Sequence, residues 1–346
     1  MAYTTINKSS EHFNTKLYTG NGSTNTIDNG FRSDFLWVKS RSTAVRHMVF
    51  DTLRGTESLS TDDSNQQYNR AGYGFTSLAS NGFTMNGNDS GYNTNTNGVN
   101  YASWNWKANG ASSSSNTDGD VTSTVSVNST AGFSIVKWTN SGNAGWIGHG
   151  LGTTPHWILI KNLGSGSSIN AWVNYHHKID ATEPEDYTIY MNNTDARSNN
   201  PVFNDTPPTS TKFRFDSGDT TDYIAYCFAE KQGFSKFGSY VGNGSTDGTF
   251  VYTGFKPAFV ICKITNGVDN WILMDNKRLG YNGANYQLLP NSTVVDQTPE
   301  RLDLLSNGFK CRNGNGEVNG SGSTYIYMAF AEAPLVGTNG VTAKAR

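Results

Sequence analysis

One strand-like segment occurs three times in the sequence, always at the same distance behind a second repeated segment. The three copies are YASWNWKA, YIAYCFAE and YIYMAFAE, which open at Tyr101, Tyr223 and Tyr325. Before each copy lies an apolar run, FLWVK, WILIK or FVICK, which ends at Lys39, Lys161 or Lys263. The lysine-to-tyrosine spacing is 62 residues in every copy (39 to 101, 161 to 223, 263 to 325). A spacing kept three times predicts an internally repeated fold.

The segments between these anchors read as short strands. Further matching segments, YTGNGS, WTNSGN and YVGNGS, open at Tyr18, Trp138 and Tyr240. The apolar runs are too short for helices, and no segment sustains an apolar period of 3.6 residues. Asn-Gly pairs such as those in SNGFT and SNGFK are expected to supply the positive φ angles of tight hairpin turns. The sequence therefore predicts antiparallel β structure.

The third copy of the repeated strand shows two different faces. Large residues alternate with smaller ones along it, so that Ile326, Met328 and Phe330 share one face, with Ala329 and its neighbours on the other. We expect the large face to fill a core and the small face to let a second sheet approach. The runs FLWV, WILI and FVIC predict strands covered on both faces, where units or subunits meet. The fold class we expect is all-β, with three tandem antiparallel β-sandwich repeats of about 100 residues, jelly-roll-like.

Composition and repeat matching divide the chain into six expected parts. The segment NGASSSSNTDGD predicts a flexible linker, because it cannot bury apolar surface. Phe234 and Phe237 indicate a packed junction that makes the second and third repeats one rigid block. The expected boundaries are an N-terminal docking arm at 1–17, repeat 1 at 18–110, a Ser/Asn-rich linker at 111–133, repeat 2 at 134–232, repeat 3 at 236–334 and a polar C-terminal tail at 335–346.

Charge and composition exclude several classes of partner. The net charge is -2 and no basic run or stripe is present, which argues against nucleic acid. No window approaches the ~18 apolar residues of a membrane span, and the first residues lack the pattern of a signal peptide. The three cysteines lie in or beside apolar runs, and we expect free thiols, with a Cys262–Cys311 bridge as the alternative.

Residue patterns that carry catalysis or metal binding are scarce. Neither a nucleophile motif nor a phosphate-binding loop occurs. His176 and His177 are adjacent and would point to opposite sides of a strand, so they do not form a chelating pair. The acidic segments IDATEPEDY and DSGDTTD lack the ligand spacing of a calcium loop and indicate a solvated insertion and a hairpin turn. We therefore expect no enzymatic activity, no cofactor and no metal.

Aromatic residues in the least repeated segments are the candidate contacts for a host glycan or receptor. Flat aromatic faces beside Asn and Asp suit both sugars and protein interfaces. The alternative is that they cap the ends of the sandwiches. These candidates are Tyr68, Tyr73, Tyr92, Tyr187, Tyr190, Tyr281 and Tyr286.

The sequence resembles a family of virion structural proteins of marine tailed bacteriophages, such as cyanophages and pelagiphages. The resemblance runs along almost the entire chain and includes MAYTTINKSSEHFNTKLYTGNGS, GHGLGTTPHWILIKN and YIYMAFAEAPLVGTN. Members of the family are described as structural, tail or fibre proteins. The resemblance implies no catalytic residue, and it leaves open whether the chain lies on the tail or on the head.

These observations lead to one expected function and three alternatives. We expect a non-enzymatic virion protein, assembled in the host cytoplasm and exposed on the particle as a tail-associated fibre or receptor-binding component. Its partners would be other virion proteins, a host surface glycan or receptor, and further copies of itself, with a trimer as one form. A capsid head-decoration or knob protein is the first alternative. A polysaccharide-degrading enzyme with paired carboxylates and a free-standing lectin are the others.

Overall fold

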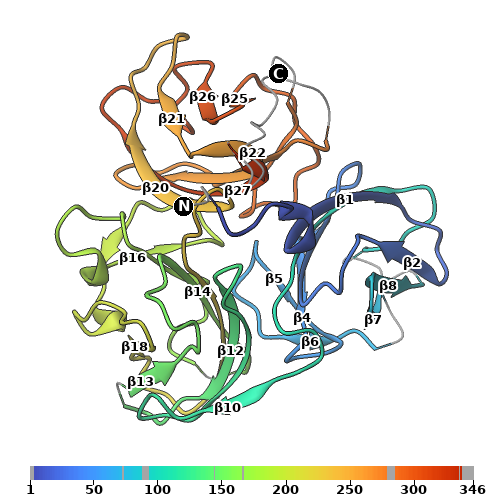
Figure 1. The fold of residues 1–346 in the computed structure, drawn as a ribbon, viewed down its shortest axis with the longest axis vertical. Coiled ribbons are helices and arrows are strands. Elements are labelled where there is room, and N and C mark those ends of the chain that lie inside the picture. Colours follow the sequence, from blue (N-terminus) through green and yellow to red (C-terminus); the bar gives the residue numbers. More distant parts are fainter. Residues whose placement is uncertain are drawn as a thin grey trace.

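A computed structural model describes residues 4–71, 74–87, 93–143, 145–165, 167–278, 285–334 and 336 of the chain. Within these residues the fold is all-β, with several antiparallel sheets and three one-turn 3-10 segments. Three lobes surround a common centre (Figure 1). We number them in chain order as lobe 1 (residues 4–110), lobe 2 (111–230) and lobe 3 (235–334).

Lobe 1 contains a six-stranded sheet of order β1-β9-β3-β4-β5-β6 and a three-stranded sheet of order β2-β8-β7. Side chains from both sheets, among them Ile27, Leu36 and Phe83, form one buried cluster, so the arrangement is sandwich-like. The elements are η1 Ser9–Glu11, β1 Phe13–Thr19, β2 Asn25–Asp28, β3 Phe35–Ser40, β4 Met48–Asp51, β5 Glu57–Ser60, β6 Tyr68–Asn69, β7 Gly74–Ala79, β8 Gly82–Asn86 and β9 Asn100–Trp106.

Lobe 2 contains an eight-stranded sheet of order β10-β11-β12-β19-β14-β15-β16-β17 and the two-stranded pair β13-β18. Ile147 and Phe213 of the pair pack with Ile158 of the large sheet. The elements are β10 Ser114–Asn116, β11 Ser123–Asn128, β12 Phe133–Thr139, β13 Gly145–Gly148, β14 Trp157–Asn162, β15 Val173–His176, η2 Pro184–Asp186, β16 Tyr187–Tyr190, β17 Ser198–Asn199, η3 Pro201–Phe203, β18 Lys212–Phe215 and β19 Asp222–Phe228.

Lobe 3 contains a five-stranded sheet of order β20-β27-β22-β23-β24 and a three-stranded sheet of order β21-β26-β25. A buried cluster lies between the two sheets and includes Val260 of the larger sheet and Phe309 of the smaller one. The elements are β20 Ser235–Val241, β21 Phe250–Tyr252, β22 Phe255–Ile264, β23 Ile272–Asp275, β24 Gln287–Leu288, β25 Leu302–Leu305, β26 Gly308–Cys311 and β27 Thr324–Pro334.

The three large sheets share one strand order. In each, the strand that carries the repeated tyrosine (β9, β19 or β27) lies between β1, β12 or β20 on one side and the strand that carries the repeated lysine (β3, β14 or β22) on the other. The next strands then follow as a meander, β3-β4-β5 in lobe 1. This meander departs from the two interlocked Greek keys of a jelly roll.

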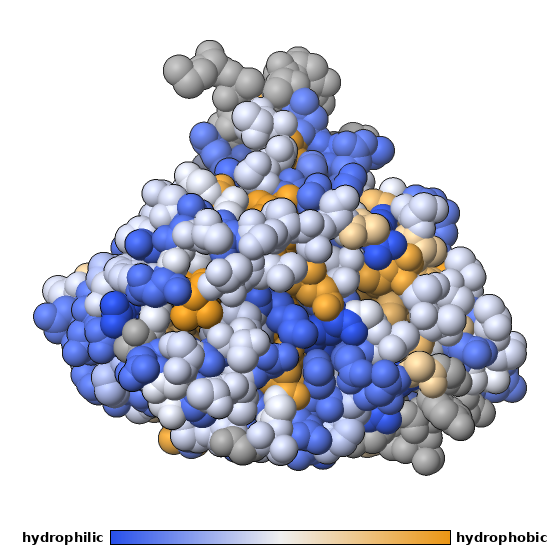
Figure 2. Space-filling model, turned by 90° about the horizontal axis from the view of Figure 1, so that it is seen from below, coloured by the Kyte–Doolittle hydropathy of each residue, from blue (hydrophilic) through white to orange (hydrophobic). Residues whose placement is uncertain are grey.

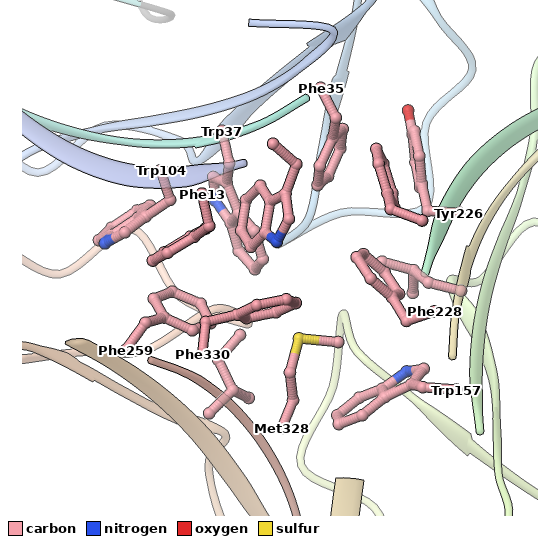
Figure 3. Close-up of a cluster of buried hydrophobic side chains, with 14 of the residues drawn as sticks. Phe13, Phe35, Trp37, Trp104, Trp157, Tyr226, Phe228, Phe259, Met328 and Phe330 are labelled. Atoms are coloured by element: carbon pink, nitrogen blue, oxygen red, sulfur yellow. The ribbon is translucent and has the colours of Figure 1, made fainter. Parts of the chain in front are cut away.

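A central hydrophobic cluster joins the lobes. It contains Phe13, Trp104 and Trp106 from lobe 1, Trp157, Tyr226 and Phe228 from lobe 2, and Phe259, Met328 and Phe330 from lobe 3. The side chains labelled in Figure 3 converge from the three lobes. The Phe13 ring lies 4.9 Å from that of Phe330, and the Phe228 ring lies 6.0 Å from it. Contact between all three lobes makes this cluster the core of the whole molecule.

Both faces of the repeated strand are buried, as is every residue of β3 and β14. The large face, with Ile326, Met328 and Phe330, lies in the central cluster between lobes. The small face, with Ala329, lies inside lobe 3. Strands covered on both faces where units meet are therefore confirmed. The large residues, however, fill the core between lobes rather than the interior of one lobe.

Two expected boundary segments are corrected by the structure. Residues 13–17 of the expected docking arm form most of β1, which pairs with β9 from Phe13 to Thr19, and Ile6 is buried in the central cluster. The expected flexible linker at 111–133 contains β10 and β11, which extend the sheet of lobe 2. Phe234 and Phe237 lie in the central cluster, so the expected packed junction between lobes 2 and 3 is present, and lobe 1 contributes to the same cluster.

The glycines of the two SNGF segments have a different role from the one expected. The hairpin turns are formed by the preceding Ser-Asn pairs, and Gly82 and Gly308 are the first residues of β8 and β26. A Cβ atom on them would lie 1.9 Å from the carbonyl oxygen of Ile27 and 2.0 Å from that of Val251. These positions need glycine because a neighbouring strand backbone approaches too closely for a side chain.

Candidate functional site

The repeated lysines form the first set of equivalent contacts between lobes. Lys39, Lys161 and Lys263 are fully buried. Each Nζ donates to the carbonyl oxygen of the next residue and to one carbonyl oxygen of another lobe. The bonds between lobes run from Lys39 to Thr293 (3.1 Å), from Lys161 to Ser64 (3.3 Å) and from Lys263 to Thr194 (3.2 Å). Lobe 1 thus binds lobe 3, lobe 2 binds lobe 1, and lobe 3 binds lobe 2, which closes a ring.

Backbone hydrogen bonds repeat the same ring two residues further on. The carbonyl oxygens of Arg41, Leu163 and Thr265 accept from the amides of Asp296 (3.0 Å), Gln67 (3.2 Å) and Arg197 (2.8 Å) of the neighbouring lobes. Burial lowers the pKa of each repeated lysine to about 8. The ring of contacts therefore contains three amines that release their protons far below the usual range of lysine.

A second set of contacts lies at the ends of β4, β15 and β23, which carry Asp51, His176 and Asp275 in equivalent register. Asp51 Oδ2 accepts from Arg54 Nε (2.5 Å) and from the hydroxyl of Tyr226 in lobe 2 (2.7 Å). Asp275 Oδ2 accepts from Arg278 Nε (2.6 Å) and from the indole of Trp104 in lobe 1 (3.0 Å). Burial alone would raise the pKa of Asp275, but Arg278 holds it below its usual value.

The equivalent position in lobe 2 has histidines in place of the ion pair. His176 Nε2 lies 3.3 Å from the carbonyl oxygen of Tyr327 in lobe 3, and His177 Nε2 lies 2.7 Å from that of Phe237. The ring of His156 lies 4.5 Å from that of His177. Both Nε2 atoms must carry hydrogen, because a carbonyl oxygen can only accept. Burial lowers the pKa of His177 to about 4 and that of His176 well below its usual value.

A groove of about 500 Å³ opens between lobes 2 and 3, beside this histidine cluster. Its walls are residues 178–181 and Arg197 from lobe 2, with Ser239–Val241, Thr265 and the start of β27 from lobe 3. Asp180 pairs with Arg197 at 2.8 Å. Hydrogen bonds from the Thr182 amide and neighbouring groups lower the pKa of Asp180 to about 2. Among the described residues, the groove offers one ion pair, hydroxyl groups and a strand edge, but no second carboxylate.

The structure scatters the candidate tyrosines over the three lobes. Tyr68 is 39% exposed on β6, where Arg70 lies over its ring. Tyr187 packs against the central cluster under Arg197, and Tyr190 accepts from Asn200 at its hydroxyl and from Trp271 at its carbonyl oxygen. Tyr286 lies under Arg41. Tyr73, Tyr92 and Tyr281 lie outside the described residues. The four described tyrosines belong to three different lobes, and three of them take part in contacts between lobes or close to them.

The other candidate polar groups serve local structure. Among the described residues, no group of three or more His, Cys, Asp or Glu side chains could hold a metal ion. Asp219 of DSGDTTD accepts from Ser167 and Tyr223. Burial raises the pKa of Asp34 to about 6, yet the amides of Ala108 and Gly110 and the side chain of Arg32 fix this carboxylate.

The three cysteines are free and buried, which agrees with the expected thiols and not with a Cys262–Cys311 bridge. Burial raises the pKa of the Cys311 thiol to about 12, and it raises the pKa values of the other two thiols as well. A thiol with so high a pKa is a poor nucleophile at neutral pH.

The surface face in Figure 2 is mainly hydrophilic, with small separate apolar patches.

Sequence reasoning missed the contacts that hold the lobes together. The signal was present, because a lysine closes each of the runs FLWVK, WILIK and FVICK, and an aspartate closes HMVFD and WILMD. A charged residue repeated beside buried strands indicates a buried partner. The partners themselves, such as Tyr226 for Asp51, are 175 residues away and have no local pattern.

Comparison with known proteins places the chain in a family but does not name a function. In the residues that the structure describes, no helix is long and apolar enough to cross a membrane. No curated protein matches the sequence. The family described as "Domain of unknown function (DUF7483)" matches residues 8–334, which span all three lobes. The chain therefore belongs to this family.

Proposed function

We propose that the protein is a non-enzymatic structural component of a bacteriophage particle, exposed on its surface. Its body consists of three tandem β-sandwich repeats closed into a ring within one chain. The observation that carries the proposal is the fate of the repeated polar residues. The repeated lysines of all three lobes are buried and donate hydrogen bonds across lobe boundaries. Asp51 of lobe 1 and Asp275 of lobe 3 are also buried, and each accepts a hydrogen bond from another lobe. Repetition here supports a rigid body rather than a reaction.

The family match supports the same reading. It begins at residue 8 and ends at 334, so the unit shared by the family is the whole ring and not one lobe. The resemblance to virion structural proteins of marine tailed bacteriophages is the reason for proposing a bacteriophage particle. A body with one continuous core resists proteolysis, because cleavage requires local opening. Such resistance suits a protein carried outside the cell.

We favour a tail-associated location, with other virion proteins as partners and host recognition as the role. A capsid decoration protein is the alternative.

The doubly buried strands are already covered within one chain, so they no longer argue for a homotrimer. Tyr187, Tyr190 and Tyr286 are half-buried and Tyr68 is exposed, so the described candidate tyrosines give a lectin little support. A polysaccharide-degrading enzyme needs two carboxylates about 5 to 10 Å apart in a cleft. Of the described residues that line the groove between lobes 2 and 3, Asp180 is the one with a carboxylate, and it is bound to Arg197.

Labelling of intact particles tests the proposal. Purified tailed-phage particles that contain this chain are probed with antibodies raised against the folded protein, and gold labels are located by electron microscopy. Labels at the tail support host recognition, and labels spread over the head support the decoration protein. Detection of the chain in infected cells without any label on purified particles would contradict a virion component.

A further inference from the structure

The outer edge of β20 is a strand edge that the described residues leave partly unpaired. β20 is the first strand of its sheet and pairs only with β27. Gly242 donates its amide to Ser323 at the end of this pairing, so the even-numbered residues of β20 face β27. The backbone groups of the odd-numbered residues, Ser235 to Val241, therefore point away from the sheet.

Most of these outward-pointing amide and carbonyl groups have hydrogen-bond partners, but those of a short stretch of β20 do not. The Ser235 amide donates to Lys231, the Phe237 carbonyl accepts from His177, and the Val241 carbonyl accepts from Thr249. Within the described residues, the amide and carbonyl of Ser239 and the amide of Val241 have no protein partner. Ser239 is exposed, and the Val241 side chain is 57% exposed. An edge of this kind is a template for another strand.

The groove between lobes 2 and 3 runs beside this open stretch. Ser239–Val241 form one wall and residues 178–181 of lobe 2 form the other. His177, next to that wall, closes the edge at Phe237. The opening is therefore about three residues long, which suits an extended segment better than the edge of a second folded sheet. Three of the five exposed large apolar side chains of the described residues lie on β20 and β21: Val241, Phe250 and Tyr252.

The equivalent edge in lobe 2 is already covered by a strand. Trp138 of β12 and Tyr240 of β20 pair with equivalent tyrosines, so Lys137 of β12 corresponds to Ser239. β11 pairs with this edge and places Thr124 opposite Lys137. Its sequence, STVSVN, alternates valine with small polar residues. The molecule thus contains its own example of the strand that such an edge binds.

We propose that the open edge of β20 binds an extended segment of another polypeptide, which adds to the sheet as an antiparallel strand in the groove between lobes 2 and 3. The segment has the character of β11, with β-branched residues alternating with small polar ones. Main-chain hydrogen bonds supply the binding, and the groove walls select the side chains. This inference does not depend on the particle to which the chain belongs.

A peptide with the sequence of residues 121–130, VTSTVSVNST, is the probe. A fluorescent form is titrated with the full chain, and binding is followed by anisotropy. We expect saturable binding that becomes about tenfold weaker in Ser239→Pro, because proline removes the amide donor at the centre of the open edge. Equal binding by Ser239→Pro, or no saturation up to about 1 mM, a concentration that corresponds to very weak affinity, would overturn the proposal.

Two N-methylated peptides test the same contact without changing the protein. Methylation of the Thr124 amide blocks a hydrogen that faces the bound edge, whereas methylation of Val125 blocks one that faces away. We expect the first to bind about tenfold more weakly than the unmodified peptide and the second to bind equally well. Equal loss in both would contradict strand addition.

Sedimentation tests whether a second copy of the chain, rather than a different polypeptide, occupies the edge of β20. Wild-type protein and Ser239→Pro are compared over a range of concentrations. We expect both to remain at the same oligomeric state, because the occupant is a segment of a different polypeptide. A concentration-dependent dimer that disappears in Ser239→Pro would mean that a second copy of the chain fills the edge, which contradicts the proposed partner.

Discussion

The junction between lobes 1 and 2 and the junction between lobes 2 and 3 use different chemistry at equivalent places. Asp51 of lobe 1 is buried with Arg54 and bound to the hydroxyl of Tyr226 in lobe 2. His176 of lobe 2 stands in the same register and lies against the carbonyl oxygen of Tyr327 in lobe 3. The first junction buries a charged pair, and the second buries uncharged rings.

The difference shows how one backbone arrangement tolerates two solutions to the same problem. A polar residue at this position faces the neighbouring lobe and must be satisfied there. An aspartate achieves this with a buried arginine, at a large cost if either partner is lost. A histidine achieves it while neutral and fails when it takes up a proton. We therefore expect the two junctions to fail under different conditions.

The largest effect is expected from breaking the charged junction. Arg54→Ala leaves the Asp51 carboxylate buried without its cation, and the side chains of the pair are only 1% and 0% exposed. We expect the free energy of unfolding to fall by about 3 to 5 kcal/mol. Urea denaturation measures the loss. Lys8→Ala is the control, because its pair with Glu11 is exposed to solvent and is expected to contribute little to stability. A loss in Arg54→Ala as small as that of the control would contradict the comparison.

The buried lysines should behave alike at both junctions. The pKa of Lys161 is about 8 in the folded protein and near the usual value of 10.5 in the unfolded chain. Between these values the unfolded state binds more protons, so this group makes stability rise with pH. We expect Lys161→Met to lose about 2 kcal/mol of the rise between pH 8 and 10.

Lys263→Met should show the same loss, because the pKa of Lys263 is also about 8. Stability is measured by urea titration of wild type and variants at each pH, and only the difference from wild type is used. A different pH slope for the two variants would show that the lysines, and not only the Asp-Arg and His groups, distinguish the junctions.

Acid should weaken the histidine junction first. The folded-state pKa values of His156, His176 and His177 lie below the usual value of 6.5 because of burial. The unfolded state therefore binds more protons as pH falls below 6.5, so stability present above that pH is lost towards pH 4. The charged neighbours are Lys178, Glu230 and Lys236, of which Glu230 and Lys236 form an ion pair.

His177→Gln tests this expectation, because the amide of glutamine can still donate to the Phe237 carbonyl oxygen. We expect the variant to recover about 1 to 2 kcal/mol of the stability that wild type loses between pH 7 and 5, a figure reduced for the partial exposure of the ring. Urea denaturation at both pH values measures it. Hydrogen exchange at pH 5 should show β20 opening more readily in wild type than in His177→Gln, and equal opening in the two proteins would contradict the comparison.

An effect of similar size is expected at the hydroxyl of Tyr226, which donates to Asp51 and accepts from Arg54 (3.2 Å). Tyr226→Phe should lower the free energy of unfolding by about 1 to 2 kcal/mol, because a hydrogen bond to a charged group is lost. A double-mutant cycle with Arg54→Ala should give a coupling of at least about 0.5 kcal/mol. Additive effects would mean that the hydroxyl does not belong to the charged junction.

Much of the local structure could be predicted from the sequence, and most of the site could not. The repeated tyrosine strands and the doubly buried lysine strands were recognisable from their apolar patterns. The sequence also pointed to a linker at 111–133, because serine and asparagine have little apolar surface, yet β10 and β11 form there by adding to an existing edge. Strand addition depends on the edge that is offered, so composition alone does not reveal it.

The candidate site residues show the same limit. The variable tyrosines were reasonable surface candidates, but Tyr187 packs against the central cluster and Tyr190 serves as an acceptor for Trp271 of another lobe. The edge of β20 had no distinguishing sequence signal, because its openness depends on what the rest of the chain does not cover.

The sequence by itself determined the number, spacing and two-sided burial of the repeated strands, because alternation and apolar runs are local properties of a chain. Only the tertiary structure decided that the lobes close into a ring, which brings Lys39 to Thr293 across 254 residues. Contacts of this kind lie between the surfaces of different sheets. Their partners are set by shape and unsatisfied polar groups, which no local pattern records.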